Sequence, residues 1–329
     1  MRIVFMGTPD FAKESLETLY NANHEIALVI TAPDKPKGRG MKLTASPVKE
    51  YAISKKLQIE QPEKITGNNE ILEKIKQANP DVLCVVAYGK ILPKEILTIA
   101  KKGAINVHGS LLPKYRGAAP IQWAILNGEE KTGITTMFMN EKLDEGDMLL
   151  KEEVKISKDE TFGELWQRLA KTGANLLIET LKLIEKNQII AIPQPNEATY
   201  APKLSKEIAK IDWENKTAGE IKNLVRGLNP IMGAYTFLNG TKIKFWKIDV
   251  VSYEEFIEKF NNFNEFAERI KKIEPGTVMH ADPKQGLYVK TKDTIISVLE
   301  IQGENAKRMS INEYLRGNEI RPMQMFECY

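Results

Sequence analysis

The first half of the chain alternates short apolar runs with longer stretches whose apolar residues recur at helical spacing. The runs Ile3–Met6, Ile26–Thr31 and Val82–Ala87 are continuous and apolar, which is typical of strands buried in a parallel sheet. Helical patterns follow, one after Gly7 and another opened by Ser46, with a proline in its first turn. This order predicts an α/β fold with a doubly wound, mostly parallel sheet.

The same alternation continues to the long helical pattern that ends the first half of the chain. Three more strands are expected, at Ala104–His108, Thr132–Met139 and Met148–Ile156, the last of them open to an antiparallel direction. Helices are expected at 68–78, Pro93–Lys102, Pro120–Leu126 and Phe162–Lys186. Residues 33–42 read P-D-K-P-K-G-R-G-M-K, and their prolines and glycines predict a loop.

Composition changes at Ile189–Lys210, where prolines and scattered lysines predict a linker. Beyond it, short apolar runs separated by Asn-Gly, Pro-Gly and Gln-Gly turns predict a small antiparallel barrel. The barrel strands are expected at Ala234–Leu238, Lys242–Ile248, Gly276–Met279, Gly286–Thr291 and Ile295–Ile301, with one helix at Ala218–Val225. We therefore expect a first domain at 1–189, a linker at 190–208 and a C-terminal domain at 209–329. Ser252–Lys272 is expected to be a surface helix or an insertion.

Composition places the chain among ordinary globular proteins. It has 329 residues, enough for two domains, of which 42% are apolar and 28% charged. The net charge of +3 is too small to indicate a nucleic-acid binder without local patches. We expect no membrane span, and the N-terminal apolar run is too short for a secretory signal. Cys84 and Cys328 give no disulfide framework or metal-binding spacing, so a reducing cytoplasm is expected.

Asn106 and His108 end an expected strand, directly before a Gly-Ser turn. Side chains alternate along a strand, so both residues point to the same face. A carboxamide and an imidazole side by side can donate to a developing oxyanion, and histidine can also move a proton near neutral pH. In doubly wound sheets ligands bind at the carboxyl ends of the strands, where His108 is expected. A hydrogen-bonded core histidine is the alternative.

Asp144 follows the expected strand Thr132–Met139, and we expect it in a loop at the same carboxyl edge of the sheet. A carboxylate there can orient the imidazole or take a proton from a nucleophilic amine. An aspartate in an ordinary turn is the alternative. The chain shows no serine or cysteine nucleophile elbow, so the set of Asn106, His108 and Asp144 suits direct transfer through a tetrahedral intermediate.

A stretch of leucines and prolines after His108 is a candidate for ligand binding. Apolar side chains with exposed backbone polar groups can frame a flat apolar ligand, although a rigid surface loop is equally compatible with this composition. The candidate residues are Ser110, Leu111, Leu112 and Pro113.

The loop at 33–42 carries a run of cations. Lys35, Lys37, Arg39 and Lys42 alternate with glycines and meet no acidic residue between positions 35 and 42. This pattern suits a loop that becomes ordered on phosphates, which we favour slightly over a solvated surface.

Several stretches together resemble the methionyl-tRNA formyltransferase family, in the family's own order and over nearly the whole chain. They read R-I-V-F-M-G-T-P-D-F-A, P-D-K-P-K-G-R-G-M-K-L-T-A-S-P-V-K, V-V-A-Y-G-K-I-L-P, I-N-V-H-G-S-L-L-P-K-Y-R-G-A-A-P-I-Q, L-D-E-G-D-M, Y-A-P-K-L-S-K-E and I-D-W. The resemblance implies a Rossmann-like catalytic domain and an oligonucleotide-binding (OB) type barrel that holds tRNA. It implies formyl transfer from 10-formyltetrahydrofolate to methionyl-initiator-tRNA, for translation initiation in the cytoplasm, without a metal.

The resemblance also implies roles for the candidate residues. Asn106, His108 and Asp144 match the catalytic set, and Ser110 to Pro113 match the folate-binding stretch. The cations from Lys35 to Lys42, Arg39 among them, match the loop that meets the tRNA acceptor arm. The C-terminal domain has nearly equal numbers of cations and acids, so its tRNA affinity must come from clusters such as Lys203–Lys210 and Lys242–Lys247. A monomer is expected.

Four other functions are alternatives. A glycinamide ribonucleotide formyltransferase needs only the first domain, so the second half of the chain counts against it. The cationic glycine-rich loop argues against a sugar-nucleotide amine formyltransferase. An RNA-binding module on a retired catalytic fold is disfavoured by intact Asn106, His108 and Asp144. A nicotinamide dehydrogenase is least favoured, because the turn after Gly7 is not G-x-G-x-x-G.

Overall fold

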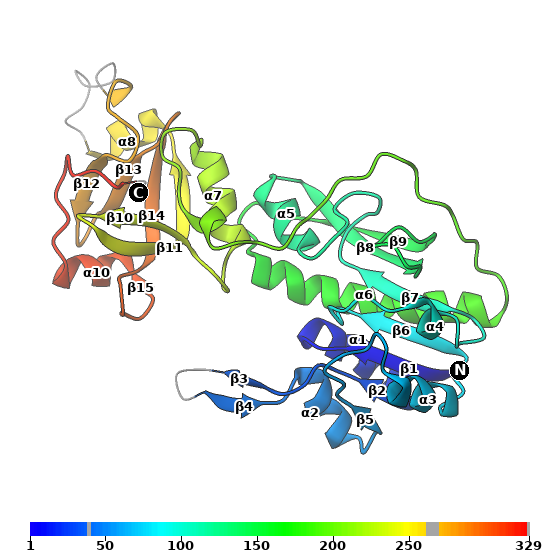
Figure 1. The fold of residues 1–329 in the computed structure, drawn as a ribbon. Helices are drawn as coiled ribbons and strands as arrows, with labels where there is room; N and C mark the ends of the chain where they lie inside the picture. Colours follow the sequence, from blue (N-terminus) through cyan, green and yellow to red (C-terminus); the bar gives the residue numbers. More distant parts are fainter. Residues whose placement is uncertain (38–40, 261–269, 328–329) are drawn as a thin grey trace. The chain divides into compact units, whose positions relative to one another are not determined.

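The computed structural model describes residues 1–37, 41–260 and 270–327. Arg39, Cys328 and part of Ser252–Lys272 lie outside the described residues. The chain divides into two compact units, shown in Figure 1. The first comprises Met1–Ile121, Glu130–Ile156 and Glu164–Lys203, and the second Gln122–Glu129, Ser157–Gly163 and Leu204–Tyr329. Much of the segment predicted as a linker thus lies along the first unit.

The first unit is built on a seven-stranded sheet with the order β5-β2-β1-β6-β7-β8-β9. Its strands are β1 Arg2–Gly7, β2 Glu25–Ile30, β5 Ile59–Glu60, β6 Val82–Val86, β7 Ala104–His108, β8 Lys131–Phe138 and β9 Met148–Lys155. The five strands from β5 to β7 are parallel, whereas β8 is antiparallel to β7, and β9 to β8. The mostly parallel α/β sheet is confirmed. The last strand, β9, is antiparallel to its neighbour β8, but because β8 is itself reversed, β9 runs in the same direction as β7.

Six helices belong wholly or partly to this unit. They are α1 Asp10–Asn21, α2 Pro47–Ser54, α3 Asn69–Gln77, α4 Lys94–Leu97, α5 Pro120–Leu126 and α6 Phe162–Glu185. The Ser46 side chain caps α2 by accepting from the Lys49 amide, as the Ser-Pro start predicts. The prediction of a helix at Pro93–Lys102 is wrong in its second half, because α4 ends at Leu97. There the amides of Lys101 and Lys102 bond to carbonyls just before β6 instead of continuing the helix.

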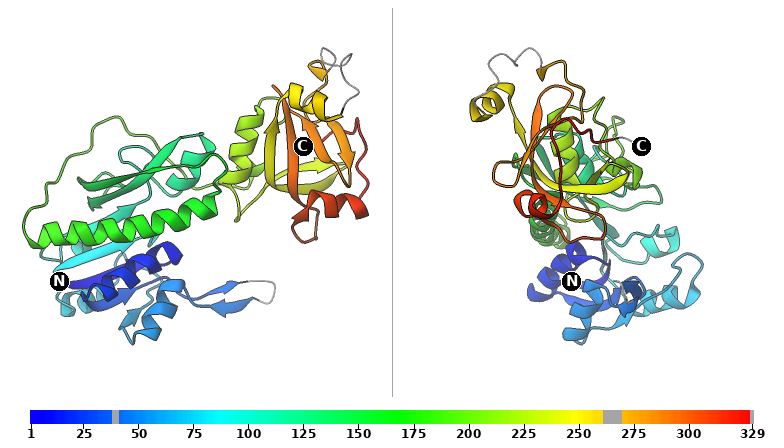
Figure 2. Two further views of the ribbon diagram at one scale, coloured as in Figure 1. Left: turned by 180° about the vertical axis from the view of Figure 1, so that it is seen from behind. Right: turned by 90° about the vertical axis from the view of Figure 1, so that its left-hand side faces the viewer.

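Helices cover both faces of the sheet. On one face α6 runs along the strands (Figure 2), and a Cβ at its Gly173 would lie 2.9 Å from a methyl group of Val107. On the other face Ile71 of α3 and Ile96 of α4 pack into one buried cluster with Val85. Because side chains alternate along β7, the residues on either side of Val107 point away from α6. The sheet therefore presents Asn106 and His108 together, as expected.

The cationic segment expected as a loop is instead the two arms of a hairpin. Strand β3 (Lys35–Lys37) pairs antiparallel with β4 (Lys42–Thr44). The pairing follows from the short connection, which brings the two arms together. At the base of the hairpin the Asp34 carboxylate accepts from Lys49 Nζ at 2.7 Å and from Gln61 Nε2 at 2.8 Å. The base of the hairpin is thus bound to α2 and to the residue that follows β5.

The second unit contains an antiparallel sheet with the order β10-β11-β14-β13-β12, and β15 pairs with β14. Its strands are β10 Ala234–Leu238, β11 Thr241–Val251, β12 Val278–Asp282, β13 Gly286–Lys290, β14 Ile295–Gln302 and β15 Met309–Ser310. Its other helices are η1 Glu207–Ala209, α7 Ala218–Gly227, α8 Tyr253–Phe260 and α10 Ile311–Gly317. Helix α8 confirms a helix in the described part of the segment at 252–272, although its Phe256 is fully buried. No helix in the described ranges is long and apolar enough to cross a membrane.

The C-terminal tail closes this sheet into a barrel. Glu327 pairs with Phe237 of β10, and Met325 pairs with Thr277 beside β12, so the tail joins the two edge strands. Between them the Phe326 ring enters the core, stacked on Trp213 with centroids 5.9 Å apart and edge-on to Phe245 at 5.5 Å. The small antiparallel barrel is confirmed, and its closure depends on a large aromatic anchor.

We expect Phe326→Ala to lower the free energy of unfolding of the second unit by about 3–5 kcal/mol, because it leaves a cavity beside Trp213 and Phe245. Urea denaturation followed by tryptophan fluorescence measures this loss. Met323→Ala is the matched control in the same tail, since Met323 is 69% exposed, and it should change stability by less than about 0.5 kcal/mol. Equal effects of the two variants would contradict closure through the Phe326 ring.

Candidate active site

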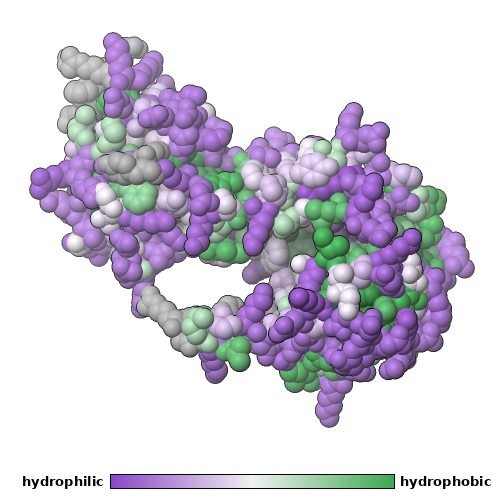
Figure 3. Space-filling view, in the orientation of Figure 1, coloured by the Kyte–Doolittle hydropathy of each residue, from purple (hydrophilic) through white to green (hydrophobic). Residues whose placement is uncertain are grey.

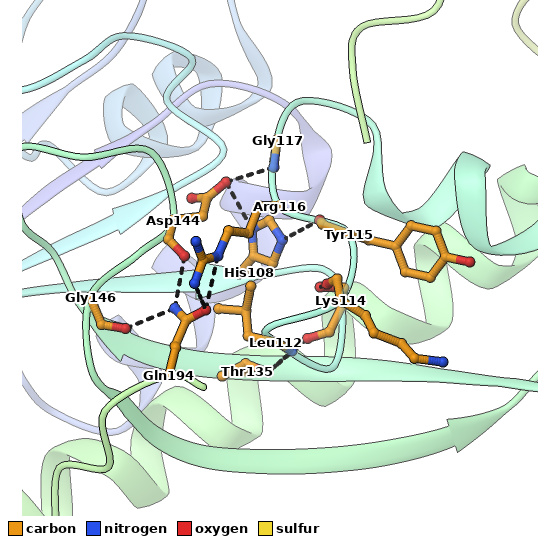
Figure 4. A network of polar contacts seen from close by, with 11 residues as sticks. His108, Leu112, Lys114, Tyr115, Arg116, Gly117, Thr135, Asp144, Gly146 and Gln194 are labelled. Atoms are coloured by element: carbon orange, nitrogen blue, oxygen red, sulfur yellow. Dashed lines mark hydrogen bonds and ion pairs between the residues drawn. The ribbon is translucent and has the colours of Figure 1, made fainter. Parts of the chain in front are cut away.

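Asn106 and His108 end β7 on the face of the sheet opposite α6. His108 is buried, with only 5% of its surface exposed, and Asn106 is half-buried. Among the described residues the Asn106 side chain has no hydrogen-bond partner, so its carboxamide remains available to a ligand. Figure 4 shows His108 at the centre of a network of polar contacts.

The imidazole of His108 is held from both sides. Its Nε2 lies 2.9 Å from the carbonyl oxygen of Tyr115. A carbonyl can only accept, so Nε2 carries a proton and donates it. The other ring nitrogen, Nδ1, lies 3.7 Å from Asp144 Oδ2, within ion-pair range. Nδ1 is therefore the nitrogen left for chemistry, and it acts next to a carboxylate.

Asp144 reaches the site by a different route from the one that the sequence suggested. Because β8 is antiparallel, Phe138 at its carboxyl end pairs with Ile105 near the start of β7. The prediction that the Asp144 loop leaves the sheet at the same edge as His108 is therefore wrong. The loop at 139–147 instead turns back along the sheet by about 10 Å, the length of three strand residues.

Two close contacts hold this loop in place. The Asp144 carboxylate accepts a hydrogen bond from the Gly117 amide at 2.8 Å. Gly146 lies so close to the end of β8 that an added Cβ would be 1.7 Å from the Phe138 carbonyl oxygen. Asp144 itself has a φ of 52°, a left-handed conformation that a non-glycine residue adopts only at some cost. The position of the carboxylate thus depends on contacts made by its loop.

The stretch Ser110–Pro113 is bound into the protein more firmly than we expected. The Ser110 hydroxyl donates to the carbonyl of Lys114, and the Leu112 amide donates to Thr135 Oγ1 at 3.1 Å. The Leu112 carbonyl accepts from Lys151 Nζ, and partial burial lowers the pKa of this lysine. The prediction of exposed backbone polar groups in this stretch is therefore wrong at Leu112, because these bonds use its amide and its carbonyl.

The apolar side chains of the same stretch lie in two different surroundings. Leu112 is buried in a cluster with Met137 and Met148, so it belongs to the core. Leu111 and Pro113 are half-buried, and their surfaces remain open to a ligand.

Arg116 and Gln194 also belong to the network, and sequence reasoning did not identify either of them. The buried Arg116 guanidinium lies 3.3 Å from the Glu145 carboxylate and donates twice to Gln194 Oε1. Arg116 stands within a quoted motif, but a lone arginine in a loop does not indicate chemistry. Gln194 stands between Pro193 and Pro195, and only this rigid setting hinted at a fixed position.

The predicted tRNA-binding cations lie on the hairpin. Lys35 is exposed on β3 and Lys42 is exposed on β4, and Lys37 is the last residue of β3. Arg39 falls in the connection at 38–40, which the structure does not describe. Across the described ranges, no cluster of His, Cys, Asp and Glu side chains is arranged to hold a metal ion.

Comparison with known proteins fits this geometry. The family model for formyl transferase matches residues 1–181, and the model for the formyl transferase C-terminal domain matches residues 203–319. A methionyl-tRNA formyltransferase of Caldanaerobacter subterraneus subsp. tengcongensis is 49% identical over 97% of this chain and 98% of its own length. The chain belongs to the methionyl-tRNA formyltransferase family. A second member, from Clostridioides difficile, is 49% identical with the same coverage.

Solved structures show the same fold outside this family. HypX from Aquifex aeolicus in complex with tetrahydrofolic acid matches with a TM-score of 0.64 and 17% identity, over 100% of this chain and 51% of HypX. The sugar 3N-formyl transferase WlaRD matches with a TM-score of 0.64 and 19% identity, over 93% of this chain and 99% of its own. At such low identity these likenesses establish only a fold shared with the methionyl-tRNA formyltransferase family.

The contact with Tyr115 makes the tautomer of His108 testable. We expect neutral His108 to carry its proton on Nε2, because the Tyr115 carbonyl accepts from that nitrogen. Long-range ¹H–¹⁵N NMR correlations at mildly alkaline pH measure the tautomer. The chain has three histidines, so a spectrum of His108→Gln assigns the signal by its loss. A proton found on Nδ1 instead would contradict the arrangement.

Proposed function

We propose that this chain transfers the formyl group of 10-formyltetrahydrofolate to the α-amino group of methionine on initiator tRNA. As a member of the methionyl-tRNA formyltransferase family, it is a formyl-transferring enzyme. The approach of His108 and Asp144 to 3.7 Å carries the proposal, together with the neighbouring carboxamide of Asn106, to which no described residue forms a hydrogen bond. The product, formylmethionyl-tRNA, serves translation initiation, and we place the enzyme in the cytoplasm as a monomer.

In the proposed reaction the methionyl amine attacks the formyl carbon and forms a tetrahedral intermediate. The amide of Asn106 donates a hydrogen bond to the developing oxyanion. His108 donates a second one through Nδ1 when that nitrogen also carries a proton, and the Asp144 carboxylate beside it balances the charge of the ring. Asp144 orients the imidazole and accepts the proton that the amine loses. The carbon–N10 bond then breaks, and N10 of the folate takes up, as it leaves, the proton that Asp144 had accepted. No covalent enzyme intermediate is needed.

For the folate, we assign contact with the ligand to the half-buried surfaces of Leu111 and Pro113. Ser110 and Leu112, whose polar groups bond within the protein, shape the stretch from behind. The loop then offers a preformed apolar surface next to the catalytic residues, as suits a flat cosubstrate.

We assign catalysis to the domain at 1–189 and tRNA binding to the barrel at 209–329. Residues 190–208 connect the two. The hairpin cations Lys35, Lys37, Arg39 and Lys42 add a second phosphate-binding element. In the barrel Lys242 stands over the ring of Tyr235 at 3.5 Å. Figure 3 shows that hydrophilic residues cover much of the visible face of the second unit.

We expect wild-type protein to formylate charged initiator tRNA and to act poorly on charged elongator tRNA. His108→Ala should lower turnover by about 10²–10³-fold, because it removes one oxyanion-stabilising group. Release of tetrahydrofolate and acid-stable formylmethionine are the measurements, with circular dichroism as the control for folding. Near-normal turnover in a folded His108→Ala protein would overturn the catalytic assignment.

Arg39→Ala tests the hairpin separately from the catalytic residues. We expect a several-fold higher KM for charged tRNA, with a weaker salt dependence, because one phosphate contact is lost. The Kd for the folate, measured by titration calorimetry with 5-formyltetrahydrofolate, should not change. Weaker folate binding with normal use of tRNA would show that the hairpin serves the folate and not the tRNA, and would overturn this assignment.

A further inference from the structure

Gln194 uses its whole side chain within the network of Figure 4. Its Oε1 accepts from Arg116 Nε at 3.0 Å and from Nη2 at 2.8 Å. Its Nε2 donates to the carbonyl of Asp144 at 2.7 Å and to that of Gly146 at 2.8 Å. A carboxamide has two acceptor positions and two donor positions, and here all four are filled.

These bonds reach the part of the site that the sheet does not position. The Asp144 loop turns back from the far end of β8, and Asp144 has a left-handed φ of 52°. Such a conformation persists only where the surroundings fix it. Gln194 bonds to the backbone on both sides of Glu145, so it holds the loop at the residue that carries the carboxylate and two residues later.

The segment that carries Gln194 is itself fixed at both ends. Before it, Ile192 pairs with Met148 at the start of β9. After it, Thr199 Oγ1 accepts from the amide of Tyr115 at 2.8 Å. Tyr115 also provides the carbonyl that holds His108 Nε2. The same short segment therefore contacts the supports of both His108 and Asp144.

We propose that Gln194 is a positioning residue for formyl transfer, acting through Asp144. Its donor side fixes the backbone of the Asp144 loop. Its acceptor side fixes Arg116, whose neighbour Gly117 gives its amide to the Asp144 carboxylate. This inference rests on the proposed function, because it assigns Gln194 to the same reaction.

The isosteric variant Gln194→Glu separates this role from simple packing. A glutamate still accepts from Arg116, but it has no protons for the two carbonyls and sets a charge against them. We expect kcat at saturating folate and tRNA to fall by up to about 10²-fold, because misplacement by about 1 Å is enough for such a loss. The KM for each substrate should stay within about threefold of the wild-type value. Gln194→Met is neutral but also removes the acceptor for Arg116, and it gives a second test of kcat against KM if the charged variant does not fold.

Asn196→Ala is the matched control. Asn196 lies on the same segment, is exposed and makes no side-chain hydrogen bond to any described residue. Its kcat and both KM values should equal those of the wild type. A loss of kcat as large as that of Gln194→Glu would show that any change in the segment slows the enzyme, and would overturn the proposal.

A double-mutant cycle with Asp144→Asn decides whether Gln194 acts through Asp144. We expect Gln194→Glu to add little to the loss already caused by Asp144→Asn. Losses that multiply would overturn the proposal, since they would mean that Gln194 acts independently of Asp144. A normal kcat in Gln194→Glu, together with a lowered kcat in Asp144→Asn, would overturn the role of Gln194 and leave the proposed function intact. A normal kcat in Asp144→Asn would instead refute the proposed catalytic set.

Discussion

The site depends on one hydrogen bond, from His108 Nε2 to the carbonyl of Tyr115. Because the carbonyl cannot donate, this bond sets the tautomer of the imidazole and commits one ring nitrogen to the protein. The other nitrogen is left facing Asp144. Which atom can stabilise an oxyanion or move a proton is thus decided by a backbone group seven residues further along the chain, and the loop from 109 to 117 must hold its shape.

The sheet positions only part of the catalytic set. Parallel pairing of β6 with β7 and alternation along β7 place Asn106 and His108 on one face without further help. Strand geometry does not position Asp144 in this way, because β8 is antiparallel to β7 and the Asp144 loop leaves β8 at the end of the sheet opposite His108. The loop is brought back and held by Gly117, by the close packing of Gly146 and by Gln194. Secondary structure therefore positions Asn106 and His108, and tertiary hydrogen bonds position the Asp144 carboxylate.

The sequence predicted what periodicity and strand geometry determine. The buried runs gave β1, β2 and β6 because a strand covered on both faces is apolar throughout. Asn106 and His108 could be paired because alternation needs no tertiary information. The direction of β8, the hairpin at β3 and β4, and the role of Gln194 could not be predicted. Each depends on a partner far along the chain, and the composition of the Gln194 segment, rich in proline, suggested only a linker.

That segment has a consequence for dividing the molecule. A fragment ending at residue 189, where the composition shifts, would contain every strand of the first sheet and all three catalytic candidates. It would nevertheless lack Gln194 and Thr199, and so would lose the hydrogen bonds that Gln194 accepts from the Arg116 guanidinium and that Thr199 accepts from the Tyr115 amide. A fragment ending near Lys203 keeps these acceptors. The functional boundary of the catalytic half thus lies about a dozen residues beyond the apparent end of its fold.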